Sequence, residues 1–122
     1  MQGWIRSGIG FLLLAASQSV WAAQPWQGQF LYSYEGGSVY RVTANHQKSM
    51  HWECIQGEEA GASGEELPER IQVRPDIYFV SWTEKSGVQV TQVLDFKSMK
   101  VYSTIIDQSA RYVLRGSIKR EK

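Results

Sequence analysis

Two short segments of this chain each place two chemically useful side chains on one face of a predicted strand. Tyr32 and Tyr34 stand two positions apart in the first segment, and Trp82 and Glu84 stand two apart in the second. Side chains two apart in a strand point to the same side of a sheet. If both faces line the inside of a barrel, two phenols, an indole and a carboxylate meet in one cavity. The pattern predicts a ligand-binding site made of these four residues.

These four side chains could also support catalysis. A carboxylate such as Glu84 can act as a general acid or base if burial raises its pKa toward neutrality. The hydroxyls of Tyr32 and Tyr34 can hydrogen-bond a ligand's carboxylate or phenol. Each residue also has a structural interpretation: Trp82 as core packing, the tyrosines as ordinary barrel aromatics, and Glu84 as an exposed strand end. Trp52 matches a strand-core position, and we interpret it as structural.

Other reactive side chains are few. Cys54 is the single cysteine, so no intrachain disulfide can form, and we interpret it as a small buried hydrophobe. His46 and His51 are the two histidines, and neither has metal-site spacing to a cysteine or an acidic cluster. We expect neither a metal nor a cofactor. A Ser-His-Asp or Cys-His catalytic arrangement has little support.

The elements that must position these residues are predicted to be strands. Segments rich in Val, Ile, Tyr, Phe and Thr recur at short intervals between turn residues, and no stretch shows a helical apolar period. Glu35-Gly-Gly-Ser38 is typical of a tight hairpin, since glycine accepts positive φ. The predicted strands cover residues 28–35, 38–44, 49–55, 68–74, 76–84, 88–96, 99–107 and 111–119.

The longest irregular stretch, residues 57–66, is rich in glycine and acidic residues. We predict a mobile, solvated loop there, long enough for a lid at the mouth of a barrel. A phosphate-binding loop is excluded because no Gly-Lys-Ser/Thr ending follows. The acids also lack the alternating spacing of calcium loops.

The first residues are interpreted as a signal peptide covering residues 1–22. A short positive start is followed by an apolar run over 9–16, with small residues near the expected cleavage before Ala23. The run is shorter than the roughly 20 apolar residues of a membrane span. We therefore expect a mature domain over 23–122, periplasmic or secreted, with no membrane span after cleavage. A retained N-terminal anchor is the alternative.

Charge excludes one class of partner. The chain has 13 Lys and Arg against 12 Asp and Glu, and removal of Arg6 with the leader leaves the two classes balanced. No basic stripe is present for a phosphate backbone, so we expect no nucleic-acid binding. About a hundred residues make one domain with one core.

The strand pattern predicts an all-β fold, a single eight-stranded antiparallel up-and-down barrel. Closure into a barrel removes exposed sheet edges, and eight strands leave room for packed side chains or one small ligand. In the last strand Tyr112, Leu114 and Ile118 share one face, while Arg111 and Arg115 take the other. An open sandwich is the alternative.

Four segments carry a family resemblance. They are Tyr32-Ser-Tyr-Glu-Gly-Gly37, Met50-His-Trp-Glu-Cys-Ile-Gln-Gly57, Ile77-Tyr-Phe-Val-Ser-Trp-Thr-Glu84 and Thr91-Gln-Val-Leu-Asp95. In the order and spacing of these segments, the chain resembles the MoaF-like domain proteins, which have a calycin or lipocalin-type barrel. It is more distantly similar to the bacterial phenolic acid decarboxylases, which share that barrel.

The decarboxylase resemblance implies roles for individual residues. Tyr32, Tyr34 and Glu84 match active-site cavity positions of that family. Those enzymes also use an arginine after a Gly-x-x-x-Gly stretch, whereas Gly57–Gly61 is followed by Ala62 here. This chain therefore lacks the arginine of the decarboxylases, unless the fold directs Arg41 or Arg111 into the cavity.

Three function classes follow. The leading one is a secreted or periplasmic barrel that binds a small aromatic or amphipathic molecule, and the residues favour binding over catalysis without deciding between them. The second is a cofactor-independent lyase related to the phenolic acid decarboxylases. The third is a periplasmic inhibitor or adaptor that captures a protein partner through the 57–66 loop.

Overall fold

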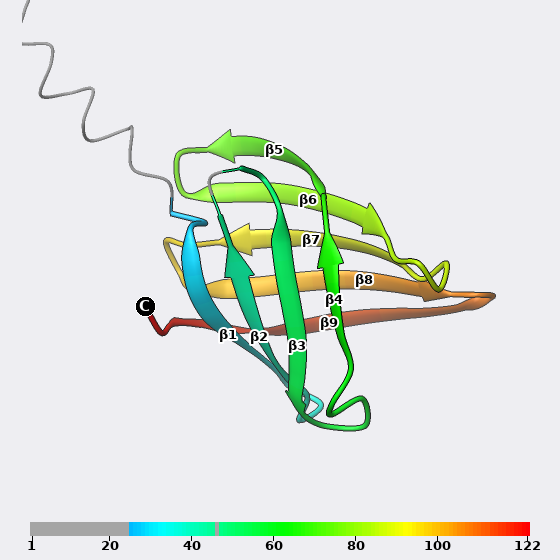
Figure 1. The fold of residues 1–122 in the computed structure, drawn as a ribbon. Helices are drawn as coiled ribbons and strands as arrows, with labels where there is room; N and C mark the ends of the chain where they lie inside the picture. Colours follow the sequence, from blue (N-terminus) through cyan, green and yellow to red (C-terminus); the bar gives the residue numbers. More distant parts are fainter. Residues whose placement is uncertain (1–24, 46) are drawn as a thin grey trace, which may run out of the picture.

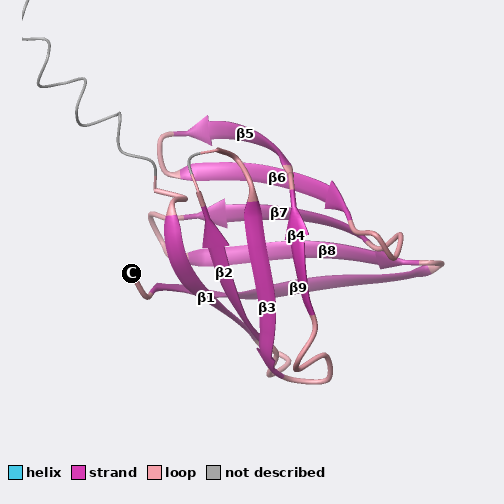
Figure 2. Ribbon diagram, viewed as in Figure 1, coloured by secondary structure: helices cyan, strands magenta, loops and turns pink. Residues whose placement is uncertain are grey.

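The computed structural model describes residues 25–45 and 47–122. The predicted signal peptide and His46 lie outside the described residues. The described part contains strands and turns and no helix, as Figure 2 shows. It therefore has no helix long and apolar enough to cross a membrane.

Nine strands form one antiparallel sheet. Its hydrogen-bonded order is β4-β3-β2-β1-β9-β8-β7-β6-β5. The strands are β1 (Gly28–Tyr34), β2 (Val39–Ala44), β3 (Met50–Gln56), β4 (Ser63–Glu66), β5 (Glu69–Arg74), β6 (Ile77–Thr83), β7 (Gln89–Asp95), β8 (Lys100–Asp107) and β9 (Ala110–Arg120). The all-β, antiparallel prediction is confirmed, and the eight predicted strands agree with the observed bounds to within one residue at each end.

The predicted count of eight strands is wrong, because residues 63–66 form the additional strand β4. This short strand pairs with β3, with Trp52 opposite Gly64 and His51 opposite Glu65. Glycine and glutamate are poor strand formers, so the segment has no strand signal of its own. Pairing with the edge of β3 overrides that local preference.

The sheet curls back on itself into a half-barrel. Figure 1 shows β1–β4 lying across β5–β9, with the chain passing from β4 directly into β5. The two end strands of the hydrogen-bonded order, β4 and β5, are consecutive in the chain. The strands therefore follow the cyclic order of an up-and-down barrel whose ladder is interrupted between β4 and β5.

Large aromatic side chains fill one end of the half-barrel. Trp26 and Phe30 are almost fully buried, and they pack near Tyr78 and Phe96 with ring centroids 5.4–6.0 Å apart. These residues lie where β1, β6 and β8 begin and β7 ends. Packing of these four rings fills this end, and the interior space lies at the other end.

Tight turns frame that other end. The β1–β2 turn is a hairpin in which Tyr34 N donates to Ser38 O (2.9 Å) and Gly37 N donates to Tyr34 O (2.9 Å). Gly37 has a φ of 104°, which explains the glycine there. The β6–β7 turn repeats the arrangement: Glu84 N donates to Val88 O and Gly87 N donates to Glu84 O, both at 2.8 Å. Tyr34 and Glu84 are thus each held at the start of a hairpin turn.

Candidate functional site

A cavity of about 660 Å³ opens at the end framed by these turns. Its size is within the range of small-molecule pockets. Tyr32, Tyr34, Trp82 and Glu84 all line it. The structure thus brings together the four residues singled out in the sequence, from strand β1 and from the end of strand β6.

The lining is dominated by aromatic and aliphatic side chains. Six aromatic residues contribute to it: Tyr32, Tyr34, Tyr40, Trp52, Trp82 and Tyr112. The apolar side chains that complete the wall are Val42, Met50, Val88, Val90, Ile105 and Leu114. The face that Tyr112, Leu114 and Ile118 were predicted to share points inward, since Tyr112 and Leu114 line the cavity and Ile118 is buried.

The hydroxyl of Tyr34 is bound within the wall of the barrel. It lies 2.7 Å from Ser103 Oγ and accepts a hydrogen bond from Gln92 Nε2 at 3.2 Å. Burial raises the pKa of Tyr34 to about 12, although the bonds to Ser103 and Gln92 act in the opposite direction. The phenol is therefore neutral at physiological pH, and its hydroxyl is used to join β1 to β7 and β8.

The hydroxyl of Tyr32 is also engaged by the protein. Trp26 Nε1 donates to it at 3.0 Å. Burial is the main cause that raises the pKa of Tyr32, and the neighbouring Tyr34 adds to it. Both tyrosines at the predicted site thus turn their hydroxyls to protein partners, so their ring surfaces are what they offer to the cavity.

Gln92 is a buried polar residue that the sequence reading missed. It lines the cavity and is 6% exposed. Its amide nitrogen binds Tyr34, whereas its Oε1 has no hydrogen-bond partner among the described residues. A buried acceptor without a donor costs about 1–3 kcal/mol. Gln92 therefore adds a buried, unpaired acceptor to the wall of the cavity.

Three aromatic residues of the lining each donate a hydrogen bond to a carboxylate. Tyr40 Oη donates to Glu59 Oε1 at 2.6 Å, Trp52 Nε1 to Glu66 Oε2 at 2.9 Å, and Trp82 Nε1 to Glu84 Oε2 at 3.3 Å. The sequence placed Trp52 in the core and gave Tyr40 no role. Both line the cavity, and Gly64 makes room for Trp52, since a Cβ there would lie 2.7 Å from the indole nitrogen.

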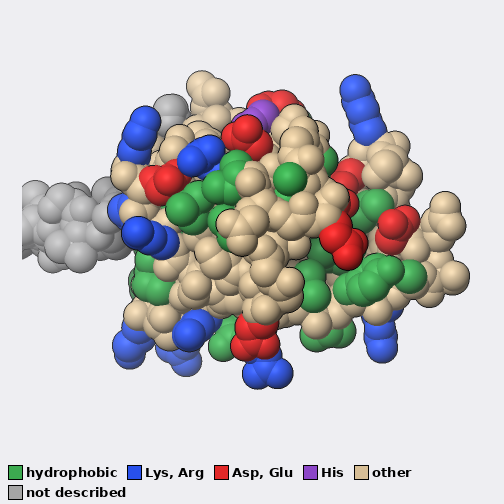
Figure 3. All heavy atoms as spheres, turned by 90° about the horizontal axis from the view of Figure 1, so that it is seen from below, with side chains coloured by type: hydrophobic (Ala, Val, Ile, Leu, Met, Phe, Trp, Pro, Cys, Tyr) green, Lys and Arg blue, Asp and Glu red, His purple; other side chains and the backbone are tan. Residues whose placement is uncertain are grey.

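Glu84 lies among other acidic groups. Burial raises the pKa of its carboxyl, the Trp82 hydrogen bond lowers it, and the charges of Glu66, Glu59 and Asp107 raise it further. Glu58, Glu59, Glu84 and Asp107 all line the cavity. Figure 3 shows acidic side chains bordering hydrophobic ones toward the end of the molecule where the β6–β7 and β8–β9 turns lie. The mouth of the cavity is therefore acidic.

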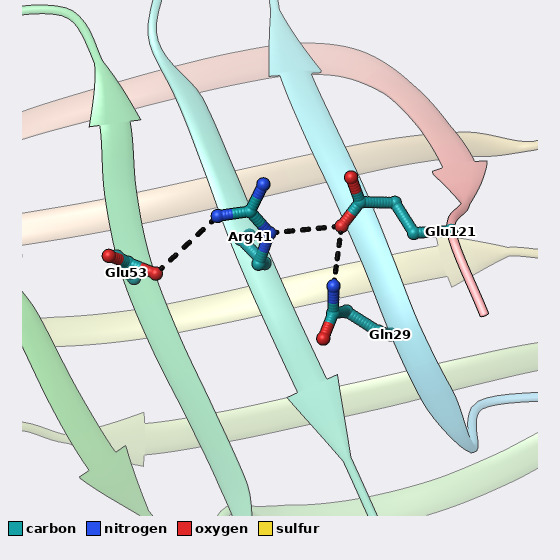
Figure 4. A network of polar contacts seen from close by, with 4 residues as sticks. All are labelled: Gln29, Arg41, Glu53 and Glu121. Carbon is teal, nitrogen blue, oxygen red and sulfur yellow. Dashed lines mark hydrogen bonds and ion pairs between the residues drawn. The ribbon is translucent and has the colours of Figure 1, made fainter.

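The arginines considered from the sequence lie away from the cavity. Arg41 is on the outer face of β2, where its Nε donates to Glu121 (3.0 Å) and its Nη1 lies 3.6 Å from Glu53 (Figure 4). Gln29 donates to the same Glu121 oxygen at 2.7 Å. Arg111 is exposed and is not part of the lining. Neither of these arginines replaces the one that the decarboxylase resemblance lacks.

Arg120 stacks on the buried Phe30, with its Cζ 4.6 Å from the ring centroid, and a second guanidinium that reaches a core ring is that of Arg70. It stacks on Trp26 with 4.3 Å between its Cζ and the ring centroid, at the end filled with aromatic side chains. Burial lowers its pKa, and the nearby phenols of Tyr78 and Tyr32 counteract this. Arg70 does not line the cavity. Tyr32, which does, lies near it.

The loop predicted over residues 57–66 is wrong in its second half, whereas residues 57–62 are exposed to solvent as predicted. Its second half is strand β4, and residues 57–62 form a turn closed by hydrogen bonds. Cys54 N donates to Ala62 O at 2.8 Å, and Gly61 N donates to Cys54 O at 2.9 Å. Cys54 itself is buried, as predicted. Gly57, Glu58 and Glu59 of this turn line the cavity at its rim.

A second hollow, of about 590 Å³, lies on the outer surface around the contacts of Figure 4. Its lining is polar: Gln29, Arg41, Lys119, Arg120, Glu121 and Lys122. Arg41 pairs with Glu121 there, and Arg120 donates to the backbone oxygens of Gln27 and Pro25. We assign the functional site to the aromatic cavity because the residues singled out in the sequence line it. Among residues 25–45 and 47–122, no group of three or more His, Cys, Asp or Glu side chains is placed to hold a metal ion.

Comparison with known proteins identifies the family. The MoaF-like family model matches residues 27–119, which include all nine strands except the last residue of β9. The chain belongs to the MoaF-like family.

A solved structure supports the fold of this MoaF-like protein. It is that of a Burkholderia vietnamiensis protein described as a putative beta-lactamase, with a TM-score of 0.72 and 24% sequence identity. The match covers 78% of this chain and 94% of the other. At this identity the likeness shows the fold alone. The comparison with curated proteins gives no match.

Proposed function

We propose that this MoaF-like protein is a small-molecule-binding protein whose ligand is aromatic or amphipathic. The observation that supports the proposal is the cavity of about 660 Å³ with six aromatic residues in its wall. Ligand pockets of this size are typically lined by apolar and aromatic side chains with a few polar groups that fix orientation. Gln92 and the carboxylates at the mouth supply such polar groups.

The charges of the side chains that line the cavity favour ligand binding over decarboxylation. A phenolic acid decarboxylase must hold a carboxylate, usually with a cation. Among the described residues, none that lines the cavity is Lys, Arg or His, and the carboxylates of Glu59 and Glu84 would repel an anionic substrate. A lyase would release carbon dioxide from p-hydroxycinnamate. Because the described lining of the cavity lacks a cation, we expect no release.

Capture of a protein partner is less well supported than ligand binding. The segment proposed for it, residues 57–66, is bound to β3 through β4 and through the turn that precedes it. Its Glu59 accepts a hydrogen bond from Tyr40 at the mouth of the cavity. We therefore assign this segment to the wall and rim of the small-molecule site.

We also propose that the protein acts outside the cytoplasm. The support is the sequence of residues 1–22, which has the charged start, apolar run and small residues of a signal peptide. The intact mass of protein recovered from the periplasm tests this. We expect the mass of a chain that begins at Ala23, and the mass of a chain that begins at Met1 would contradict cleavage.

The experiment for ligand binding is native mass spectrometry of gently purified protein. We expect a reproducible small-molecule adduct that is lost in Trp82→Leu, because Trp82 lines the cavity. Tyr102→Leu is the matched control, since Tyr102 is 46% exposed on β8 and does not line the cavity. Loss of the adduct in both variants, or in neither, would contradict the assigned site.

A further inference from the structure

The ionisable groups of the cavity have one sign. Four carboxylates line it, those of Glu58, Glu59, Glu84 and Asp107, and no basic side chain of residues 25–45 or 47–122 does so. The whole chain is nearly neutral, with 13 basic and 12 acidic residues. The acidity is therefore a local property of this site. Close carboxylates repel one another, and this repulsion is strongest where the walls are apolar.

Two of these carboxylates are oriented by the aromatic wall. Glu59 accepts a hydrogen bond from Tyr40 at 2.6 Å, and Glu84 accepts one from Trp82 at 3.3 Å. In each case the bond uses one named oxygen, Oε1 of Glu59 and Oε2 of Glu84. A carboxylate accepts several hydrogen bonds, so each retains capacity for a ligand's donor. The rings that hold the acids are also the surfaces on which a cation is attracted.

Gln92 adds a polar residue to the wall of the same cavity. It belongs to β7, only 6% of it is exposed, and it lines the same cavity. Its Oε1 has no partner among the described residues, while its amide nitrogen is bound to Tyr34. An ammonium or guanidinium group offers several N–H donors and no acceptor. The donors of such a group complement the carboxylates at the mouth, whereas Gln92 lies further along β7, beside the hydroxyl of Tyr34.

We propose that the ligand of this cavity is an organic cation, with its ammonium or guanidinium charge at the mouth beside Glu59 and Glu84. Its apolar part then lies inside, against Trp52, Trp82 and Val90. This inference rests on the proposed function, since it names the chemical class of ligand for the same cavity. It also explains why one set of residues combines aromatic rings with acids: the rings supply cation–π attraction and the acids supply charge-assisted hydrogen bonds.

The test uses three probes with the same body and different charge. They are 4-phenylbutylammonium, 4-phenylbutanol and 4-phenylbutanoate, titrated into the purified protein at neutral pH by calorimetry and tryptophan fluorescence. We expect the ammonium compound to bind about tenfold or more tightly than the alcohol, and the carboxylate to bind more weakly than the alcohol. The preference should shrink at high salt, since part of it is electrostatic.

Two charge-removing variants locate the preference. Glu84→Gln and Glu59→Gln should each reduce the ratio of ammonium to alcohol affinity several-fold and leave the alcohol affinity unchanged. Glu53→Gln is the matched control because it removes the same charge from the outer face of β3, where Glu53 pairs with Arg41. That control should leave the ratio unchanged.

The outcomes separate this inference from the proposed function. If the alcohol or the carboxylate binds as tightly as the ammonium compound, and Trp82→Leu weakens all three, the cavity is a binding site and the cationic ligand class is wrong. If Glu53→Gln changes the ratio as much as Glu84→Gln, the preference comes from overall charge and the inference also fails. If no probe binds at millimolar concentration, both the inference and the proposed function are contradicted.

Discussion

Replacing Tyr34 by Phe separates the structural and ligand-binding roles of the tyrosine hydroxyl. The hydroxyl lies 2.7 Å from Ser103 Oγ and 3.2 Å from Gln92 Nε2, and Tyr34 is 8% exposed. Phenylalanine keeps the ring against the cavity and removes only these two hydrogen bonds. We therefore expect a loss of stability with little effect on the affinity of a cavity ligand.

The size of the loss follows from the two partners left behind. Ser103 is 2% exposed and Gln92 is 6% exposed, so water cannot readily replace the lost hydroxyl. A buried polar group without its partner costs about 1–3 kcal/mol. The Gln92 bond is at the long end of its range, so its share is expected to be small. The total is about 2–4 kcal/mol, a large part of the roughly 5–15 kcal/mol by which domains are stable.

Urea unfolding followed by tryptophan fluorescence measures this change. Tyr34→Phe should lower the free energy of unfolding by about 2–4 kcal/mol with an unchanged slope against urea. The control is Tyr102→Phe on the exposed side of β8, which should change stability by no more than about 0.5 kcal/mol. Ser103→Ala and the double variant complete a cycle, and their coupling with Tyr34→Phe should be about 0.5–3 kcal/mol.

Two results would refute this reasoning. If Tyr34→Phe unfolds like the unmodified protein but loses its cavity ligand, the hydroxyl contacts the ligand and the bonds to Ser103 and Gln92 contribute nothing to stability. A coupling near zero between Tyr34 and Ser103 would also contradict the account, because the two substitutions would then act independently.

Three further predictions follow. Burial raises the pKa of Tyr34 to about 12, so the unfolded chain loses this proton near pH 10 while the folded one keeps it; stability should fall between pH 10 and 12 by up to about 1.4 kcal/mol per pH unit, and less steeply in Tyr34→Phe. Gly116→Ala should destabilise the protein by about 1–3 kcal/mol in urea unfolding, because its Cβ would lie 2.3 Å from the backbone oxygen of Ser33. The pKa of Glu84 is raised, mainly by burial, so its contribution to stability is present at low pH and is lost as pH rises through its folded pKa. Glu84→Gln keeps an acceptor for Trp82 and should therefore raise the melting temperature at pH 7 and not at pH 4. An equal change in melting temperature at both pH values would contradict this.

Much of the fold could be predicted because the strand signal is local. Alternation of apolar and polar residues fixes which side of β9 faces inward, and turn residues such as Gly37 mark where strands end. Strand β4 could not be found this way. Its sequence Ser-Gly-Glu-Glu has low strand preference, and it forms because β3 offers it an edge.

The site could be predicted in part for the same reason. The common parity of Trp82 and Glu84 is a local property, and it places both residues at the cavity. The roles of Gln92, Glu59 and Tyr40 depend on contacts across strands that no spacing reveals. Gln92 meets Tyr34 from 58 positions away, and Tyr40 meets Glu59 from 19 positions away. The direction of each tyrosine hydroxyl was equally invisible, because it depends on Trp26 and Ser103.

The two ends of the half-barrel carry groups of opposite charge. At the closed end the cation of Arg70 stacks on Trp26, and the hydroxyl of Tyr32 accepts from the same indole. At the open end the acids are held by Tyr40 and Trp82. The positive group is thus covered by aromatic packing, and the negative groups are presented at the mouth. A ligand that enters from the mouth meets acceptors first and rings next, and this order favours a molecule with its charge at one end and its apolar body at the other.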